Sequence, residues 1–373
     1  MSGSLHLLAV NWRDIRNPEA GGAEVHLHEI LTRMVQRGHS ATLVATGFPG
    51  AKSEEVVDGI RVLRGGSWWN ANFVLPRLAK GALRARHVDL VVEDINKIPF
   101  FMPLYTHHPV LAVIPHLFGT TVFRETNPVL ATYVLAWEAF IPAVYRRSRF
   151  VAISPSTRDD LVRRGVAAAR VDVVLCGLDH HLYRVLPDVS RAEEPTVVHL
   201  GRLRKYKAVD VVLRAFVQVR TRVPRARMLV VGDGPELPAL RRLSDSLGVA
   251  AAVEFTGRIG GEEVVAILNR AHVCVNASPK EGWGLTVVEA NACGVPVVGS
   301  DRPGLRDSIH DGQTGFLVPY GDVDGFADKI AALLDDAELR ARMGAAALAW
   351  SRSLTWEKTA DEMERVFVEA AAR

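Results

Sequence analysis

Residues 273–290 read VCVNASPKEGWGLTVVEA, a stretch that contains a strand, a loop and the beginning of a helix. The apolar run at its start suits a buried parallel strand, and a helical pattern begins near Thr286. Gly282 and Gly284 lie between them, where the absence of a Cβ lets the backbone come close to a ligand. We expect the N–H groups of Gly284, Leu285 and Thr286, at the positive end of the helix dipole, to bind an anion.

Similar pairs of an apolar run and a helical pattern recur along the whole chain. Strands are predicted at residues 5–10, 41–45, 60–63, 90–93, 111–114, 150–153, 171–174, 196–200, 228–231, 253–256, 273–276, 297–298 and 316–318. Helices are predicted at residues 23–37, 129–145, 156–164, 209–219, 237–247, 262–269, 286–292 and 356–371. Strands that alternate with helices of about 10–15 residues favour parallel sheets with helices on both faces. We therefore expect an α/β protein of two Rossmann-like, doubly wound parallel-sheet domains that face a central cleft.

The length of the chain, 373 residues, predicts two domains at roughly 100–200 residues per domain. We place the first domain at residues 1–179 and the second at residues 195–355. Residues 180–194 lack periodicity and contain clustered charge, so we interpret them as a linker. The last helix, within 356–373, has one apolar stripe, which suits either the core of the second domain or packing back on the first.

The composition excludes several classes of protein. The 45 basic and 42 acidic residues leave a net charge of +3, which argues against a nucleic-acid partner. Three scattered cysteines are too few for a disulfide framework. We find neither a signal peptide nor an apolar run of about 18 residues that could span a membrane. We therefore expect a cytoplasmic protein. One predicted helix carries four basic residues, which fits either peripheral contact with the inner face of a membrane or a solvated face. These residues are Arg77, Lys80, Arg84 and Arg86.

Charged side chains flank the predicted anion site. Glu281 and Glu289 can accept hydrogen bonds from sugar hydroxyls, and the alternative is that both are solvated surface charges. Arg202 and Lys207 follow the first strand of the second domain, where a guanidinium and an ammonium suit a diphosphate. Because two further basic residues lie between them, a solvated basic loop is the alternative.

The first domain has its own candidates. Gly21 and Gly22 separate the first strand from the first helix, where the backbone can approach a phosphate or a sugar, and a flexible turn is the alternative. Their pattern is not G-x-G-x-x-G, which disfavours a dinucleotide-binding oxidoreductase. His116 follows another predicted strand, and a histidine packed in an apolar strand end is the alternative. Asn96 and Lys97 follow a further predicted strand and could line the part of the cleft that holds a second substrate, an acceptor, although a structural role is favoured.

In this order and spacing, the motifs resemble the retaining glycosyltransferases of family 4, which have the two-Rossmann GT-B fold. Glu281 and Glu289 are spaced as in the Glu-x7-Glu signature of that family. Ala208 is a departure, because family members often have glycine after the lysine, and this leaves Lys205 as an alternative to Lys207. The other matching segments are Gly21-Gly22-Ala23-Glu24, Pro115-His116-Leu117-Phe118-Gly119, Gly201-Arg202-Leu203, Gly232-Asp233-Gly234-Pro235, 291–298 and 312–318.

The resemblance also implies roles for individual residues. Glu281 would hold hydroxyls of the donor sugar, and Glu289 would hold the ribose. The nucleotide base would stack near Arg258 and Ile259. The implied catalytic residues are His116, Arg202, Lys207 and Glu281. The implied donor-binding residues are Gly21, Gly22, Gly201, Arg202, Lys207, Arg258, Ile259, Glu281, Gly284, Leu285, Thr286 and Glu289.

The sequence thus predicts a glycosyltransferase that moves a sugar from a nucleotide-diphosphate sugar to an acceptor hydroxyl with retention of anomeric configuration. We expect UDP as the donor nucleotide, with GDP, dTDP or ADP as alternatives, and no required metal ion or other cofactor. The acceptor is a sugar, a lipid-linked sugar or a natural product. An aromatic and apolar run forms either an acceptor groove or core, and it comprises Trp68, Trp69, Phe73, Phe100, Phe101, Leu104 and Tyr105. A nucleotide-sugar epimerase of the same architecture and a non-catalytic nucleotide-sugar binding protein are the alternative functions.

Overall fold

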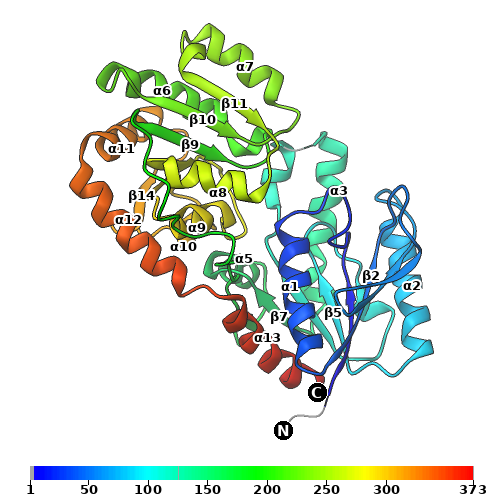
Figure 1. Ribbon diagram of the computed structural model, residues 1–373. Helices are drawn as coiled ribbons and strands as arrows, with labels where there is room; N and C mark the ends of the chain where they lie inside the picture. The colour runs from blue at the N-terminus through cyan, green and yellow to red at the C-terminus, as the bar shows by residue number, and fades with distance from the viewer. Residues whose placement is uncertain (1–3, 125, 373) are drawn as a thin grey trace. The chain divides into compact units, whose positions relative to one another are not determined.

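The computed structural model describes residues 4–124 and 126–372, and the chain divides into two compact units. Unit 1 comprises Met1–Gly177 together with Trp356–Arg373, and unit 2 comprises Leu178–Thr355. Each unit is a parallel sheet with helices on both faces (Figure 1). The predicted fold class, two parallel-sheet α/β domains, is therefore confirmed.

The sheet of unit 1 has eight strands in the order β3-β4-β2-β1-β5-β6-β7-β8. Their bounds are β1 (His6–Val10), β2 (Ser40–Ala45), β3 (Glu54–Val57), β4 (Ile60–Arg64), β5 (Leu90–Asp94), β6 (Val110–Ile114), β7 (Arg149–Ala152) and β8 (Val171–Val173). Neighbouring strands are parallel except β3 and β4, which form an antiparallel hairpin that the sequence did not predict. Asp58 and Gly59 have φ of 48° and 83°, as a two-residue type I′ hairpin turn requires.

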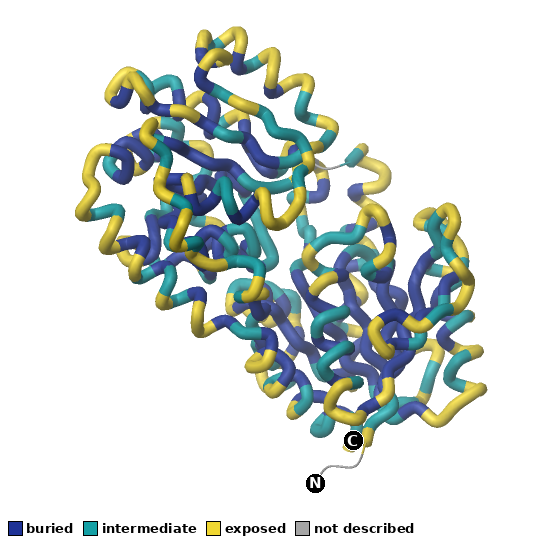
Figure 2. The backbone as a smooth tube through the Cα atoms, viewed as in Figure 1, coloured by how far each residue is buried: buried dark blue, intermediate teal, exposed yellow. Residues whose placement is uncertain are grey.

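Alternate residues of the unit 1 strands face two layers of helices. Leu7 and Ala9 of β1 pack in one buried cluster with α1 (Gly22–Gln36) and α13 (Trp356–Ala371). Leu8 of β1 packs on the other face. The helices of that second cluster are α2 (Ala71–Ala85), α4 (Ile141–Val144) and α5 (Pro155–Arg163). Figure 2 shows the buried residues concentrated along the strands, as the pattern of continuous apolar runs predicts.

One predicted helix of unit 1, at 129–145, is two helices. They are α3 (Pro128–Ala139) and α4, which meet at Phe140. Pro142 lies in the first turn of α4 and has no N–H to donate to the carbonyl four residues before it, so a continuous helix ends there. Unit 1 also contains short 3₁₀ helices at Met102–Leu104, Gly119–Arg124 and Ala168–Arg170.

The C-terminal helix α13 belongs to unit 1, so of the two alternatives the structure selects packing back on the first domain. Met363 and Phe367 are fully buried in the same cluster as β1 and α1. Arg37, the residue after α1, forms ion pairs with Asp361 at 2.7 Å and with Glu364 at 2.6 Å. α13 lies beside α1 in Figure 1, although the two helices are at opposite ends of the sequence.

Unit 2 has a six-stranded, all-parallel sheet in the order β11-β10-β9-β12-β13-β14. Its strands are β9 (Thr196–Leu200), β10 (Arg227–Val231), β11 (Val253–Gly257), β12 (Val273–Asn276), β13 (Val297–Ser300) and β14 (Gly315–Val318). Its helices are α6 (Val209–Arg222), α7 (Leu237–Ser246), α8 (Gly261–Arg270), α9 (Leu285–Ala292), α10 (Leu305–Ser308), α11 (Val323–Asp335) and α12 (Ala337–Arg352), with 3₁₀ helices at Lys205–Lys207 and Ala250–Ala252. The sequence analysis did not predict α10, α11 or α12.

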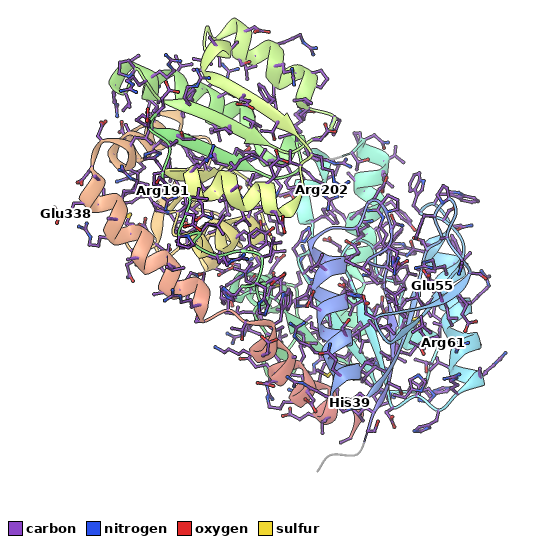
Figure 3. The ribbon with its side chains drawn as sticks, in the orientation of Figure 1. His39, Glu55, Arg61, Arg191, Arg202 and Glu338 are labelled. Carbon is purple, nitrogen blue, oxygen red and sulfur yellow. The ribbon has the colours of Figure 1, made fainter. Side chains whose placement is uncertain are left out.

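The segment 180–194, interpreted above as a linker, is part of unit 2. It has no helix or strand, but Leu182, Tyr183 and Leu186 pack against a buried cluster that contains residues of α8 and α9. Arg191, labelled in Figure 3, donates to the carbonyl oxygens of Leu268, Asn269 and Ala271. Lack of periodicity therefore indicated irregular backbone here, and the interpretation as a free linker is wrong.

Both sheets have a point where the strand order reverses. In unit 1 it lies between β1 and β5, and in unit 2 it lies between β9 and β12. The loops after two such neighbouring strands diverge to opposite faces and leave an opening at the carboxyl edge of the sheet, where ligands of open α/β sheets bind. Among the described residues, no helix combines the length and the apolar character needed to cross a membrane.

Candidate active site

The principal candidate site lies in unit 2, at the carboxyl ends of β9 and β12. These strands pair in parallel, with Val197 opposite Val273, so their following loops leave the same edge of the sheet. The loop after β9 carries Arg202 and Lys207, and Arg202 is exposed there (Figure 3). The loop after β12 carries Glu281 and leads into α9. The structure therefore brings together two motifs that are about 75 residues apart in sequence.

Lys207 and Glu281 form a buried ion pair. The Lys207 Nζ and Glu281 Oε1 atoms are 2.5 Å apart, and the side chains are only 11% and 14% exposed. Burial lowers the pKa of Lys207, but the charge and hydrogen bond of Glu281, together with Tyr206, more than offset burial and raise the pKa above its usual value, so the ammonium stays charged. The sequence analysis placed each residue on a different part of the donor, whereas the structure pairs them with each other.

The backbone at Ala208 explains why Lys207, rather than Lys205, points inward. Ala208 has φ 49° and ψ 40°, the left-handed conformation that glycine usually supplies, and it ends the 3₁₀ turn Lys205–Lys207. Lys207 is buried by this turn, while Arg204 and Lys205 are exposed. Ala208 therefore adopts here the backbone conformation that a glycine would usually supply.

Two further glycines allow the site loops to approach each other, and the sequence reasoning did not single out either one for this. A Cβ on Gly232 would lie 2.0 Å from the Gly201 carbonyl oxygen. A Cβ on Gly304, whose φ is +84°, would lie 2.3 Å from the Glu281 carbonyl oxygen. Pro303 also accepts a hydrogen bond from the Glu281 N–H at 3.1 Å. The position of Glu281 thus depends on a close backbone contact that only glycine permits.

Helix α9 begins where the sequence analysis placed an anion site. Gly284 precedes it with φ +93° and accepts a hydrogen bond from the Val287 N–H at 2.9 Å, while the N–H groups of Leu285 and Thr286 come too early in the helix to have an acceptor within it. The side chain of Asn276 at the end of β12 donates to the Thr286 hydroxyl at 3.4 Å. These contacts position the first turn of α9 beside the end of β12.

Glu289, on the second turn of α9, is not a solvated surface charge. Burial raises its pKa to about 7, while a hydrogen bond from the Tyr183 hydroxyl and the nearby Lys207 charge act in the opposite direction. Tyr183 belongs to the segment that had been interpreted as a linker. The sequence carried no signal for this contact, because it joins residues more than a hundred positions apart.

A buried histidine lies beneath the same loops. His199 of β9 has Nδ1 3.2 Å from the Val275 carbonyl oxygen, and burial followed by the charge of Lys207 lowers its pKa to about 4. It is therefore neutral at physiological pH. A histidine inside the apolar run at 196–200 could have marked this residue as a candidate for the site, but no role was predicted for it.

The structure places Arg258 and Ile259 in the loop after β11, two strands away from β9. Arg258 is exposed, and Ile259 packs on the α8–α9 cluster. The Gly232 N–H donates to the Gly257 carbonyl oxygen at 3.0 Å, which links the loop after β10 to the end of β11. The two residues thus lie on the same edge of the sheet as Gly201.

In unit 1, polar side chains gather where β1 and β5 end. Asn96 Nδ2 donates to Asn11 Oδ1 at 2.9 Å and to Glu24 Oε1 at 3.3 Å. The Gly21 N–H donates to Glu24 Oε2 at 2.7 Å, which ties the glycine loop to this cluster. Asp94 is fully buried beside it, and burial, followed by the charges of Glu24 and Glu93, raises its pKa well above the usual range. Of the cluster, the sequence analysis named Gly21 and Asn96 as site residues.

The remaining candidates of unit 1 lie on neighbouring loops. His116 follows β6, is partly buried, and has its ring centroid 5.0 Å from that of Phe118. Lys97 Nζ lies 5.3 Å from the centroid of the Trp12 ring. The members of the aromatic and apolar run, predicted as either an acceptor groove or core, differ in burial. Phe100 is buried in the core and Phe101 is partly buried. Its exposed members are Trp68, Trp69, Phe73, Leu104 and Tyr105.

Two family models together match most of the chain. Residues 20–182 match the model described as Glycosyltransferase Family 4, and residues 187–350 match the model described as Glycosyl transferases group 1. Within the described residues, the structure groups no three His, Cys, Asp or Glu side chains in a way that could hold a metal ion.

One curated relative and two solved structures align with this chain over nearly its full length. A GDP-mannose-dependent alpha-(1-6)-phosphatidylinositol monomannoside mannosyltransferase of Mycolicibacterium smegmatis is 39% identical over 369 residues, which is 90% of this chain and 91% of the relative. A sucrose-phosphate synthase of Thermosynechococcus elongatus superposes with a TM-score of 0.84 at 21% identity, over 99% of both chains. Anabaena HepE in complex with UDP-glucose superposes with a TM-score of 0.77 at 20% identity, over 98% of this chain and 100% of HepE.

The fold and these matches define a glycosyltransferase of GT-B type. The chain belongs to the family 4 type of glycosyltransferases.

Proposed function

We propose that the protein transfers a sugar from a nucleotide-diphosphate sugar to an acceptor hydroxyl with retention of anomeric configuration. The observation that carries this proposal is the buried Lys207–Glu281 pair at the opening between β9 and β12, next to the start of α9. The cation and the helix N–H groups match the diphosphate of such a donor, which carries the leaving oxygen, and the carboxylate matches the sugar hydroxyls.

In the proposed reaction the departing diphosphate gains negative charge as the glycosidic bond breaks. Lys207, Arg202 and the first N–H groups of α9 stabilise that charge, which lowers the barrier more than it strengthens binding of the intact donor. Glu281 accepts hydrogen bonds from the donor sugar and keeps Lys207 charged. The acceptor oxygen bonds to the anomeric carbon from the face that the diphosphate leaves, and its proton passes to the leaving diphosphate oxygen, so neither a side-chain nucleophile nor a side-chain base is needed. Because these groups supply the positive field, we propose that turnover requires no metal ion.

We propose GDP-mannose as the donor. The sequence alone favours UDP, but the relative that is 39% identical along nearly the full chain is named as GDP-mannose-dependent. The name of the same relative also contains its acceptor, a phosphatidylinositol monomannoside, so we propose that the acceptor is a sugar carried on a lipid-linked polyol. Unit 1 would hold it at the opening between β1 and β5, where Asn96 and Glu24 present buried amide and carboxylate groups. His116 and Lys97 would border that opening.

We propose that helix α2 makes peripheral contact with an anionic membrane at its cytoplasmic face. The helix contains no Asp or Glu, and its exposed side chains recur at the spacing of a single helix face. Trp68 and Trp69, just before the helix, are 70% and 71% exposed and suit the lipid interface. The exposed side chains of α2 include Phe73, Arg77, Lys80 and Arg84.

A transfer assay tests the function. We expect radiolabelled mannose from GDP-mannose to enter a phosphatidylinositol-mannoside acceptor, with the α-anomer of the donor retained in the product. Sugars linked to UDP, dTDP or ADP are compared with GDP-mannose as donors in the same assay. If the donor sugar is epimerised when no acceptor is present, the protein is instead an epimerase. If it binds the donor tightly but forms no product with any acceptor, it is a non-catalytic binding protein.

Vesicle co-sedimentation tests the membrane contact. The triple variant Arg77→Glu/Lys80→Glu/Arg84→Glu should lose binding to phosphatidylglycerol vesicles and keep binding to GDP. Charge reversal at Arg241 and Arg242 of α7, which are also exposed, is the control and should leave vesicle binding unchanged. Equal loss in both variants would contradict a role for α2.

A further inference from the structure

A cavity of about 480 Å³, here called the amino-edge cavity, opens in unit 1 where β6 and β7 begin. Leu111 of β6 pairs in parallel with Arg149 of β7, so the amino ends of both strands meet at one edge of the sheet. The candidate site residues of unit 1 follow the carboxyl ends of the strands, at the opposite edge. The amino-edge cavity is therefore separate from the opening between β1 and β5.

The side chains that line the amino-edge cavity offer hydrogen-bond donors and positive charge. Among the described residues that line it, none is an Asp or a Glu. The polar lining residues come from the loop before β6 and the loop before β7, and they are Thr106, His107, His108, Arg147, Ser148 and Arg149. An opening lined by guanidinium and imidazole groups, without a carboxylate, suits an anion.

The two arginines of the cavity differ in what they can offer a ligand. Arg149 is only 11% exposed, and it pairs with Asp172 and Glu369, each at 2.6 Å. Arg365 pairs with the same two carboxylates, so these four charges cancel. The Arg149 Nε–H is nevertheless buried without an acceptor in the part of the chain that the structure describes, which makes it an unused donor. Arg147 is exposed and forms no ion pair with a described residue, so its charge is uncompensated.

Hydrogen bonds fix both loops that form the amino-edge cavity. The Arg170 guanidinium donates to the carbonyl oxygens of Tyr145 at 3.1 Å and of Ser148 at 3.4 Å. The Ser148 N–H donates to the Tyr145 carbonyl oxygen at 2.9 Å, which closes a turn in the loop before β7. In the loop before β6, the His108 N–H donates to the Thr106 hydroxyl at 3.0 Å. The cavity is thus preformed, so a ligand that enters it loses little binding energy to the ordering of these loops.

We propose that the amino-edge cavity binds the phosphate group of a phosphomonoester or phosphodiester. Arg147 supplies the positive charge, and the two histidines and the Arg149 Nε–H supply further donors. Phosphate oxygens accept several hydrogen bonds, and a guanidinium matches them in both charge and geometry. The inference is independent of the donor site in unit 2.

Two sources of such a phosphate group share this chemistry. Leu104 and Tyr105 are 68% and 39% exposed, and they come directly between the lining residues Pro103 and Thr106. Apolar and aromatic side chains at the rim suit the interface of a bilayer, in which case the phosphate is that of a lipid headgroup. The other source is a soluble phosphate ester.

The test is a titration of the full chain with inorganic phosphate, followed through the ring ¹H–¹⁵N signals of His107 and His108. The variants His107→Gln and His108→Gln assign the two signals. Saturating GDP is present throughout, because the donor site of the proposed function would also bind phosphate. We expect both signals to shift and to saturate at the same phosphate concentration.

Arg147→Glu and Arg146→Glu form a matched pair of variants. Both residues are exposed and adjacent, but only Arg147 lines the cavity. Arg147→Glu should raise the Kd for phosphate on the order of tenfold or more, as expected for the loss of a charge-assisted hydrogen bond. Arg146→Glu should change it little, because solvent and salt screen an exposed charge outside the cavity. Arg147→Gln should weaken binding in the same direction, and it serves if charge reversal impairs folding.

Vesicles and a soluble ester separate the two sources. If the phosphate is that of a lipid headgroup, Arg147→Glu should bind phosphatidylglycerol vesicles less well than Arg146→Glu does. If it belongs to a soluble ester, the two variants should bind the vesicles equally, and glycerol 3-phosphate should shift the two histidine signals at a lower concentration than inorganic phosphate does.

Two results would overturn the proposal. One is the absence of a saturable shift at His107 and His108. The other is an equal loss of phosphate affinity in Arg147→Glu and Arg146→Glu, which would show that only the general surface charge matters. Neither result bears on Lys207 and Glu281, because the transfer assay tests the proposed function at a different site.

Discussion

Replacing Glu281 by leucine leaves the Lys207 ammonium buried without its carboxylate. Both side chains are nearly nine-tenths buried and the charged atoms are 2.5 Å apart, so solvent can replace little of the lost interaction. Removing one partner of such a pair costs about 3–5 kcal/mol. For a unit of this size, each kcal/mol lowers Tm by about 2–4 °C, so we expect the melting transition of unit 2 to fall on the order of 10 °C.

The matched double variant, Lys207→Met/Glu281→Leu, should recover most of this stability. It replaces the ion pair by apolar side chains of similar volume, which is often neutral for folding. It should nevertheless be inactive in transfer, because the cation that faces the leaving diphosphate is gone. Asp328→Asn is the control: its pair with Arg222 is about half exposed and should contribute at most about 1 kcal/mol.

Calorimetry of the full chain and the transfer assay provide the measurements. The folded-state pKa of Lys207 is raised above its unfolded value, so the contribution of the pair is fully present below about pH 10 and is lost as the pH rises through the folded pKa. The stability difference between the wild type and the Glu281→Leu variant should narrow there. A Glu281→Leu variant as stable as the wild type, or an active double variant, would refute this reasoning.

Three other predictions concern the same site. Arg202→Ala should lower kcat for transfer on the order of 10²–10³-fold, and the neighbouring exposed Lys205→Ala should be nearly silent; the reverse pattern would move the diphosphate contact to Lys205. Gly304→Ala should destabilise unit 2 by more than Gly312→Ala, as measured by denaturant unfolding. Both glycines have positive φ, at a cost of about 1–2 kcal/mol for alanine, but only the Cβ at 304 would meet the Glu281 carbonyl, at 2.3 Å. Transfer activity should survive EDTA, and a complete loss restored by Mg²⁺ would show that the reaction needs a metal ion.

The strands of both sheets were predictable because each is a short run of apolar residues, and a strand buried on both faces requires such a run. The hairpin strand β3 escaped prediction for the converse reason. It reads EEVV at the edge of the sheet, with only Val57 buried, so it carries no apolar signal of its own. Helix α13 was predicted, but its apolar stripe could serve either domain. Contacts of Phe367 and Arg37 in unit 1 decide between them.

In the candidate site, the identities of the charged residues were predictable from motifs, but their partners were not. Lys207 and Glu281 are 74 positions apart, and the sequence suggested a separate part of the donor for each. Tyr183 lies in a stretch without periodicity, and nothing local relates it to Glu289. Its segment is held by a turn at Asp179 and by two hydrogen bonds with Asn269 of α8.

The sequence by itself determined the fold class, most of the strands and helices in their order, and the loops that carry the charged motifs, because apolar periodicity and glycine placement are local properties of the chain. Only the tertiary structure decided that Lys207 faces Glu281, that Tyr183 packs against the α8–α9 cluster and that α13 packs on unit 1. Those contacts arise where elements distant in sequence meet, and their energies depend on burial and hydrogen bonding that no local pattern specifies.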